Sequence, residues 1–320
     1  MTILRQPTRA GVRDAAAKLA AVVPPSPLFV HEINGVAVAF KAECLQPIGS
    51  FKLRGAWHRL TAIDAESRPR GVVAFSSGNH AQGVAWAAMR LGMPALIVMP
   101  SDAPVVKREA TLAMGAEIVT YDRATESREK IAASLAGARN AALVPSFDDP
   151  WIIEGQGSAA IEAAAQMTVQ GLSAPTQVLV PCGGGGLAAG TALALPEATI
   201  TVVEPEGWDD MRRSLEAGWI EPVGANPPTT ACDSLQTKEV SRLTFDVLSR
   251  RGVRGLAVSE LEIEAAQRWA ARHLRIVVEP GGTVALAALL AGKVEAAPGM
   301  LVMLSGGNVD PAAYAAVLAR

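Results

Sequence analysis

The 320-residue sequence is poor in several features that would indicate particular classes of protein. It has 6 Trp, 6 Phe and 2 Tyr, and its 29 Lys and Arg residues are balanced by 31 Asp and Glu residues. A near-neutral chain lacks the basic charge that binds nucleic acid, and so few aromatic residues form no platform for stacking single-stranded bases. The composition therefore argues against a nucleic-acid partner.

Long apolar runs are also missing, although half of the residues are hydrophobic. No stretch approaches the ~20 apolar residues that a bilayer-spanning helix requires. Residues 1–20 lack the apolar core of a secretory signal, and Cys44, Cys182 and Cys232 are too few and too widely spaced for a disulfide framework. We therefore expect a cytoplasmic protein with reduced cysteines and no membrane partner.

The chain does contain short β-branched runs that alternate with longer Ala-rich segments. Several runs are apolar throughout, as in strands buried on both faces of a parallel sheet. The predicted strands are 36–42, 71–76, 95–100, 117–121, 141–145, 177–181, 199–204, 276–279 and 300–305. The predicted helices are 51–65, 81–91, 105–114, 125–136, 154–166, 187–195, 261–273 and 283–291. Alternating strands and helices predict an α/β fold, and the length allows two lobes.

Three of the predicted strands run into glycine-rich turns, at 77–80, 183–186 and 305–308. Such a turn before a helix presents free backbone N–H groups at the carboxyl edge of a sheet, where anionic ligands bind. Four successive glycines, Gly183 to Gly186, are costly in conformational entropy. We therefore predict that this loop brings backbone N–H groups close to a phosphate.

The same loop can be compared with two known phosphate-binding motifs. A P-loop needs a Lys where Thr191 stands, so that motif is excluded. Gly184, Gly186 and Ala189 spell GxGxxA after a predicted strand, and Glu204 ends the next strand at the place of a ribose-binding acid. This segment alone therefore leaves an NAD-binding oxidoreductase open.

A lysine at the start of the first predicted helix is the next chemical signal. Ser50 is a suitable N-cap, which would place Lys52 in the first helical turn. A cation there opposes the helix dipole, and the same field lowers the pKa of its amine, as a nucleophile or base requires. A solvent-exposed surface lysine is the alternative at this point.

Four motifs together resemble a known family. GSFKLRGA (49–56), SSGNHAQG (76–83), GGGGLAAG (183–190) and SGGN (305–308), in this order, resemble the fold type II pyridoxal-phosphate enzymes of the serine/threonine dehydratase and serine racemase branch. The resemblance extends over nearly the whole chain. It implies a two-lobed, tryptophan synthase β-like fold with open, twisted, mainly parallel sheets flanked by helices. It also implies a large cofactor-binding domain of residues 1–49 and 148–320, a small inserted domain of residues 50–147, and a homodimer.

The resemblance also implies roles for the residues of the cofactor site. Lys52 would bind pyridoxal 5′-phosphate covalently and act as the catalytic base, and Phe51 would pack beside the ring. Asn79 would hydrogen-bond the ring hydroxyl, and Ser305 would face the pyridine nitrogen. The phosphate would lie in the cradle formed by Gly183, Gly184, Gly185, Gly186 and the N–H of Leu187.

The implied substrate site lies on the second motif. Ser76, Ser77, Asn79 and His80 would bind the α-carboxylate of an amino acid. Ser77 would also be a second base that permits racemisation, with a turn serine as the alternative. Arg128 matches a family arginine that can pair with the second carboxylate of a 3-hydroxyaspartate-like substrate, although a surface arginine is the simpler interpretation.

The acidic segment 204–210, whose Glu204 was considered above as a ribose-binding acid, has a second interpretation that the resemblance implies. Glu204, the carbonyl of Trp208 and Asp210 match a family site for a divalent cation. Oxygen ligands of this kind suit Mg²⁺ or Ca²⁺. The alternative is a solvated acidic turn.

Two positions depart from the family pattern and bear on the substrate. Ile48 stands where Thr is usual, and Ser234 stands where Gly is usual. The predicted function is a dehydratase that converts a small 3-hydroxy amino acid, of the L-threonine or L-serine type, to a 2-oxo acid and ammonia. Serine racemase and 3-hydroxyaspartate ammonia-lyase are alternatives on the same scaffold. An NAD-binding oxidoreductase and a non-catalytic ligand-binding protein are more distant alternatives.

Overall fold

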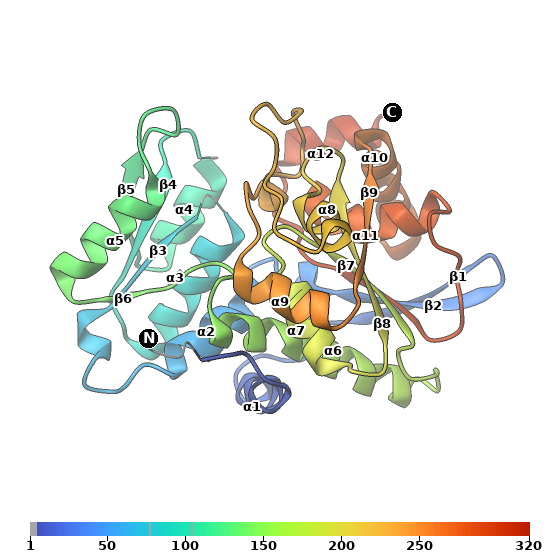
Figure 1. The fold of residues 1–320 in the computed structure, drawn as a ribbon, viewed down its shortest axis with the longest axis horizontal. Coiled ribbons are helices and arrows are strands. Elements are labelled where there is room, and N and C mark those ends of the chain that lie inside the picture. Colours follow the sequence, from blue (N-terminus) through green and yellow to red (C-terminus); the bar gives the residue numbers. More distant parts are fainter. Residues whose placement is uncertain (1–4, 77, 104) are drawn as a thin grey trace.

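The chain is built around two β-sheets on opposite sides of the molecule (Figure 1). The computed structural model describes residues 5–76, 78–103 and 105–320. One sheet has four strands in the order β5-β4-β3-β6, and the other has six in the order β1-β2-β10-β7-β8-β9. The strands are β1 (Leu28–Ile33), β2 (Val36–Ala42), β3 (Val72–Phe75), β4 (Ala95–Pro100), β5 (Glu117–Tyr121), β6 (Ala142–Leu143), β7 (Gln177–Pro181), β8 (Thr199–Pro205), β9 (Arg254–Val258) and β10 (Met300–Leu304).

All neighbouring strands among the described residues are parallel except the β1–β2 pair. Every residue of β4 and of β10 is buried, which explains why these segments are apolar without alternation. The predicted α/β fold with mainly parallel sheets is confirmed. The four-stranded sheet lies within residues 72–143, and the domain boundaries at 50 and 147 stay a prediction.

Ala- and Gly-rich helices cover the sheets and pack closely on one another. The α-helices are α1 (Arg9–Ala20), α2 (Lys52–Thr61), α3 (Asn79–Leu91), α4 (Val105–Ala113), α5 (Arg128–Arg139), α6 (Pro150–Val169), α7 (Gly186–Ala194), α8 (Asp210–Ala217), α9 (Arg242–Arg250), α10 (Glu260–Trp269), α11 (Pro280–Leu290) and α12 (Pro311–Leu318). A Cβ on Gly190 would lie 2.3 Å from the backbone oxygen of Ile153, so α6 and α7 touch through their backbones. None of the helices in the described part of the chain is long and apolar enough to cross a membrane.

The structure corrects several local predictions. The segment 276–279 is not a strand; it crosses to the SGGN turn, where the Glu279 N–H donates to the Gly306 carbonyl at 2.9 Å, and Glu279 becomes the N-cap of α11. Ser50 is not the N-cap of α2, which is Phe51, and the Ser50 hydroxyl has no hydrogen-bond partner among the described residues. Lys52 is nonetheless the first residue of α2, as predicted.

Sequence patterns also missed two strands and four helices. These are β1, β9, α1, α8, α9 and α12. They lie mostly at the outside of the six-stranded sheet, where β1 and β9 are its edge strands. An edge strand has a partner on one side only and is partly exposed, so its sequence lacks the continuous apolar run of a central strand.

Candidate active site

One cavity lies between the two sheets, at the carboxyl ends of β3, β7 and β10. The carboxyl edge of a parallel sheet is where α/β proteins bind ligands. The lining includes all the residues predicted to bind the cofactor: Phe51, Lys52, Asn79, Gly183, Gly184, Gly185, Gly186, Leu187 and Ser305. The fold therefore brings together four segments far apart in sequence, and the role of each residue stays a prediction.

The amine of Lys52 points into this cavity. Its Nζ donates a hydrogen bond to the Ser146 carbonyl at 3.1 Å and lies 5.1 Å from the centre of the Phe51 ring. Burial lowers the pKa of the Lys52 amine to about 8, and the charge of Glu279 opposes this shift. An amine with this pKa is partly unprotonated near neutral pH, so it can act as a nucleophile or a base.

The glycine loop after β7 is built for close approach. Gly185 has a φ of 85°, in the left-handed region, and is the N-cap of α7. A Cβ on Gly184 would lie 2.3 Å from the ring of Phe147, so a side chain at this position is excluded. The Thr244 hydroxyl fixes the loop by donating to the Gly184 carbonyl at 2.9 Å. The loop therefore presents its N–H groups and the positive end of α7 to the cavity, which suits a phosphate.

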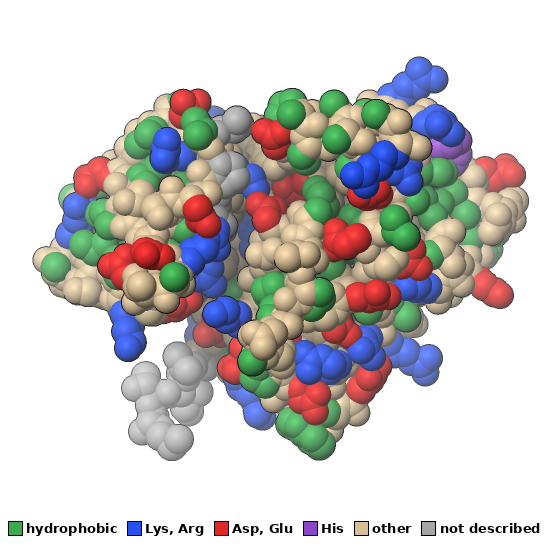
Figure 2. Space-filling view, turned by 90° about the horizontal axis from the view of Figure 1, so that it is seen from above, with side chains coloured by type: hydrophobic (Ala, Val, Ile, Leu, Met, Phe, Trp, Pro, Cys, Tyr) green, Lys and Arg blue, Asp and Glu red, His purple; other side chains and the backbone are tan. Residues whose placement is uncertain are grey.

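The cavity continues toward solvent between the two halves of the molecule. Its outer part is lined by Ser76, His80, Lys107, Arg128 and Asp233, and Lys52 and Asn79 line it as well. Figure 2 shows the furrow between the two halves, with Lys and Arg side chains along it. Predicted substrate-binding residues thus share a cavity with the predicted cofactor site, while Ser77 lies outside the described residues.

The side chain of His80 is bonded to the backbone of the protein. Its Nε2 contacts the Val144 carbonyl at 2.9 Å, and burial, with Lys52 nearby, lowers the pKa of the imidazole to about 3. The ring is therefore neutral with Nε2 as the donor, and Nδ1 has no proton to donate to a carboxylate. What His80 can offer an α-carboxylate is its backbone N–H in the first turn of α3.

Two basic residues besides Lys52, namely Lys107 and Arg128, line the outer cavity. Arg128 begins α5, stacks over the Phe75 ring at 5.5 Å and donates from Nε to Glu129 at 2.8 Å. Lys107 of α4 forms an ion pair with Asp233 across the cavity. The outer cavity therefore presents two cationic side chains, each of which is paired with a carboxylate.

The predicted cation ligands are buried rather than solvated. Glu204 and Asp210 are both fully inaccessible to solvent. The Glu204 carboxylate accepts from the N–H groups of Met211 and Arg212, at 3.1 and 2.8 Å, whereas neither Asp210 oxygen has a partner among the described residues. Burial raises the pKa of Asp210 to about 7 and that of Glu204 well above its usual range. The interpretation as a solvated acidic turn is therefore wrong.

Several cavity residues were not singled out from the sequence. Five of them lie outside the four motifs, and the sequence assigns them no role: Lys107, Phe147, Asp233, Thr237 and Glu279. Phe147 lies in the loop after β6, which ends at Leu143, and a position shortly beyond the carboxyl end of a strand is the signal that could have located it. Lys107 has no comparable signal because it lies inside a helix.

Comparison with known proteins gives consistent matches. The family model described as "Pyridoxal-phosphate dependent enzyme" matches residues 22–306. The chain is 41% identical over 317 residues to the L-threo-3-hydroxyaspartate ammonia-lyase of Pseudomonas sp, covering 96% of this chain and 97% of that protein. It is 36% identical over 324 residues to the serine racemase of Schizosaccharomyces pombe, covering 98% of each.

Solved structures show the same likeness in three dimensions. A threonine deaminase from T.th. superposes with a TM-score of 0.87 at 40% identity, covering 95% of this chain and 99% of that one. Maize serine racemase superposes with a TM-score of 0.89 at 32% identity, covering 98% of both chains.

Proposed function

Because the chain belongs to the family of pyridoxal-phosphate-dependent enzymes, as an ammonia-lyase related to threonine deaminase and serine racemase, we propose that it converts a 3-hydroxy amino acid with a second carboxylate to a 2-oxo acid and ammonia. L-threo-3-hydroxyaspartate is such a substrate, and L-serine and L-threonine are the weaker substrates of the same class. The observation that carries the proposal is that the Lys52 amine, the glycine loop and two further basic residues share one cavity.

The residues present fit pyridoxal phosphate. The loop Gly183–Gly186 leaves no room for side chains on its Phe147 side, and its N–H groups suit a phosphate of about two negative charges. Lys52 would hold the cofactor covalently, Asn79 would donate to its ring oxygen, and the neutral hydroxyl of Ser305 would face its ring nitrogen. The NAD-binding alternative loses its support, because Glu204 is fully buried and is not among the residues that line the cavity at the glycine loop.

When bound, the cofactor supplies a sink for the negative charge left at the α-carbon of the substrate. The chain supplies the base: the Lys52 amine, whose pKa is about 8, accepts the α-proton at Nζ. A neutral partner such as Ser305 does not stabilise a positive charge on the ring nitrogen, which favours prompt loss of the 3-hydroxyl as water. Hydrolysis of the released enamine then yields the 2-oxo acid and ammonia.

The preference for a second carboxylate is supported by charge. Arg128 and Lys107 face the outer cavity, beside the turn at Gly78 that precedes α3. A planar guanidinium binds a carboxylate through two hydrogen bonds, and Arg128 uses only its Nε on Glu129 among the described residues. L-serine and L-threonine have no group that would use this charge.

The first experiment tests the cofactor and the lysine. Wild-type protein incubated with pyridoxal phosphate should show the visible absorption band of a lysine-bound cofactor, and Lys52→Ala should lose it. Lys18→Ala is the matched control, because Lys18 lies on α1 and pairs only with Asp14 at the surface. The proposal fails if wild type has no band or if Lys52→Ala keeps it.

The second experiment tests the substrate. Release of 2-oxo acid should be fastest from L-threo-3-hydroxyaspartate, and Arg128→Ala should lower kcat/KM for that substrate about 10- to 100-fold, with little effect on L-serine. Arg139→Ala is the control on the same helix, since Arg139 pairs with Glu117 at the surface. Equal losses for both substrates would contradict a carboxylate-reading role for Arg128.

We further propose that Glu204, the Trp208 carbonyl and Asp210 hold Mg²⁺ or Ca²⁺, which would neutralise the buried, unpartnered Asp210 carboxylate. Added Mg²⁺ or Ca²⁺ should raise the Tm of wild type and leave that of Asp210→Asn unchanged. A Tm that neither ion moves in wild type would contradict the site.

Racemisation, domain division, assembly and location are the remaining parts of the proposed function. Racemisation would depend on Ser77, so a chiral assay of Ser77→Ala should detect no D-amino acid while elimination continues.

Residues 50–147 would form a small domain inserted in a large one. A homodimer is tested by sedimentation, and a cytoplasmic location is tested by cell fractionation.

A further inference from the structure

The side-chain amide of Asn79 is held from both ends. Its Nδ2 donates to Glu279 Oε1 at 2.6 Å, and its Oδ1 accepts from Asn308 Nδ2 at 2.8 Å. The same Asn308 nitrogen lies 2.8 Å from the Ile48 carbonyl and 2.9 Å from Gln82 Oε1. Asn79 itself is nearly fully buried and lines the cofactor cavity.

The groups at the two ends of this hydrogen-bond series, Glu279 and the Ile48 carbonyl, determine which atoms donate and which accept along it. A carboxylate and a backbone carbonyl only accept hydrogen bonds, whereas an amide offers both a donor and an acceptor. With Glu279 at one end, Asn79 must turn its NH₂ group toward the carboxylate. With the Ile48 carbonyl at the other end, Asn308 must present its own NH₂ group to Asn79 Oδ1. The second N–H of Asn79 Nδ2 then remains free for a group in the cavity.

The surroundings of Glu279 show that this contact is built into the fold. The carboxylate is 1% exposed, lines the cofactor cavity, and has an Oε2 with no hydrogen-bond partner in the described part of the chain. A Cβ on Gly306 would lie 2.3 Å from Glu279 Oε1, so the second residue of the SGGN motif must lack a side chain for this approach. The glycine of the SGGN motif thus makes room for the Glu279 carboxylate as well as forming the turn.

The charged and titratable groups that face Glu279 come from several elements. Burial, together with the charge of Asp233 in the 3₁₀ turn after residue 232, raises the pKa of Glu279 to about 7, whereas Lys107 of α4 and the side chains of Asn79 and Ser234 act in the opposite direction. The charge of Glu279 also acts to raise the pKa of Lys52 in α2 and the pKa values of the buried thiols of Cys44 and Cys232. Glu279 is therefore a buried acidic group that interacts electrostatically with several residues around the cofactor cavity.

We propose that Glu279 is a positioning residue that fixes the amide of Asn79 with its NH₂ group toward the ring oxygen of the cofactor. The inference rests on the proposed function, because it assumes a ring oxygen beside Asn79. Without an acceptor at this place, the amide is oriented by Asn308 alone, and its rotation would turn its own oxygen toward the ring oxygen, which it repels. Glu279 acts through Asn79 and needs no contact with the substrate.

Two substitutions separate position from charge. Glu279→Gln keeps an oxygen at the same distance and removes the charge, whereas Glu279→Asp keeps the charge and draws the oxygen back by one methylene. Positioning predicts that Glu279→Asp lowers kcat about 10- to 100-fold with KM changed less than about 3-fold, and that Glu279→Gln keeps kcat within about 5-fold of wild type. The visible band of the bound cofactor, recorded from pH 6 to 9, should shift in Glu279→Asp and stay near that of wild type in Glu279→Gln.

Glu154→Gln is the matched control, because Glu154 is also fully buried and contacts Arg5, Thr8 and His58 rather than the cavity. It should lower the Tm without changing the band. Wild-type-like spectra and kcat in Glu279→Asp would overturn the inference, as would a larger effect in Glu279→Gln than in Glu279→Asp. Absence of a band in wild type would instead overturn the proposed function.

Discussion

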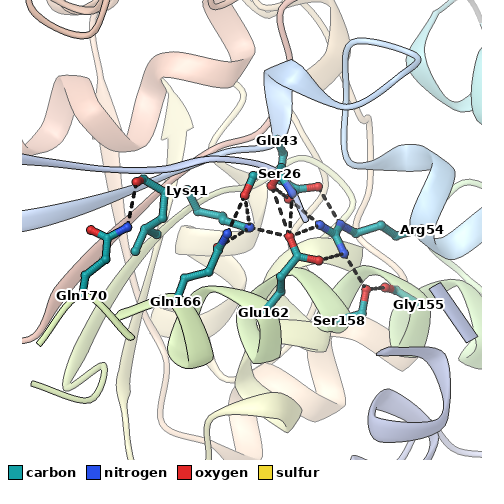
Figure 3. A network of polar contacts seen from close by, with 10 residues as sticks. Ser26, Lys41, Glu43, Arg54, Gly155, Ser158, Glu162, Gln166 and Gln170 are labelled. Carbon is teal, nitrogen blue, oxygen red and sulfur yellow. Dashed lines mark hydrogen bonds and ion pairs between the residues drawn. The ribbon is translucent and has the colours of Figure 1, made fainter. Parts of the chain in front are cut away.

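Two groups of charged residues connect the halves of this protein, and they differ in burial. The first, which we call the Arg54 cluster, consists of Ser26, Lys41, Glu43, Arg54, Ser158, Glu162 and Gln166 (Figure 3). The second, the mouth pair, consists of Lys107 and Asp233 at the outer end of the cavity. The cluster is almost completely enclosed, whereas Asp233 of the mouth pair has 42% of its side chain exposed.

The Arg54 cluster is a set of paired charges with good geometry. Arg54 bonds Glu43 through Nε at 2.7 Å and Nη2 at 2.8 Å, and Glu162 through Nη1 at 3.1 Å and Nη2 at 2.9 Å. Lys41 adds a bond to Glu162 at 2.5 Å and one to the Ser26 carbonyl at 2.7 Å. Burial lowers the pKa of Lys41, and the charge of Arg54 helps to hold the pKa of Glu43 below its usual value.

The contrast shows how the reactive lysine is supported. Arg54 lies in the same helix turn as Lys52, so the cluster fixes the start of α2 to α6 and to the turn after β2. The mouth pair holds α4 of the four-stranded half to the turn at 233–235 of the other half, at the place where a substrate must pass. We infer that the cluster contributes stability and the mouth pair contributes to the handling of substrate.

Breaking the Arg54 cluster should have the largest effect on stability. Arg54→Met leaves the fully buried Glu43 carboxylate without its ion-pair partner and removes one of the two cations bonded to Glu162, so we expect a loss of about 3–5 kcal/mol in the free energy of unfolding, measured by urea denaturation. Arg139→Met is the control, because Arg139 and its partner Glu117 form an exposed ion pair. If the free energy of unfolding falls equally in both variants, burial does not make the Arg54 cluster more stabilising than an exposed ion pair.

The unpaired carboxylate of Glu279 should give a smaller, pH-dependent effect. Its pKa in the folded protein, about 7, lies above the ordinary value of 4.5, so the folded state holds the proton more tightly. The contribution of Glu279 to stability is therefore full below about pH 4.5 and falls as the pH rises to about 7, by at most about 3 kcal/mol. Urea denaturation of wild type and Glu279→Gln at pH 5 and pH 8 checks this: Glu279→Gln should gain stability relative to wild type at pH 8. No gain at pH 8 would contradict the raised pKa.

Breaking the mouth pair should have the smallest effect on stability and a clear effect on substrate use. Lys107→Met should change the free energy of unfolding by at most about 1 kcal/mol, because Asp233 is partly exposed and its charge can be solvated. It should lower kcat/KM for 3-hydroxyaspartate more than for L-serine, since an ammonium beside the Gly78 turn is lost. A loss of stability as large as that of Arg54→Met would remove the distinction between the two groups.

Much of the fold was predictable because local patterns follow from buried strands. Uninterrupted apolar runs located β2, β4, β7 and β10, and the turns after β3 and β7 showed where helices begin. The third glycine turn, 305–308, is not followed directly by a helix; α12 begins at Pro311. The SGGN turn instead folds back, and Gly306 pairs with Ser50.

The sequence by itself determined the α/β alternation and the order of the four motifs, because these are local signals of residue type and spacing. The family resemblance that the motifs carry then implied site roles for Lys52, Asn79, Gly183–Gly186 and Ser305. Only the tertiary structure decided which polar groups meet in the cavity. Asn79 and Glu279 are 200 positions apart, and Lys107 and Asp233 are 126 apart, so no pattern within one segment encodes either contact. Their burial, their pKa values and their directions of hydrogen bonding arise from packing between two sheets, which a linear pattern does not contain.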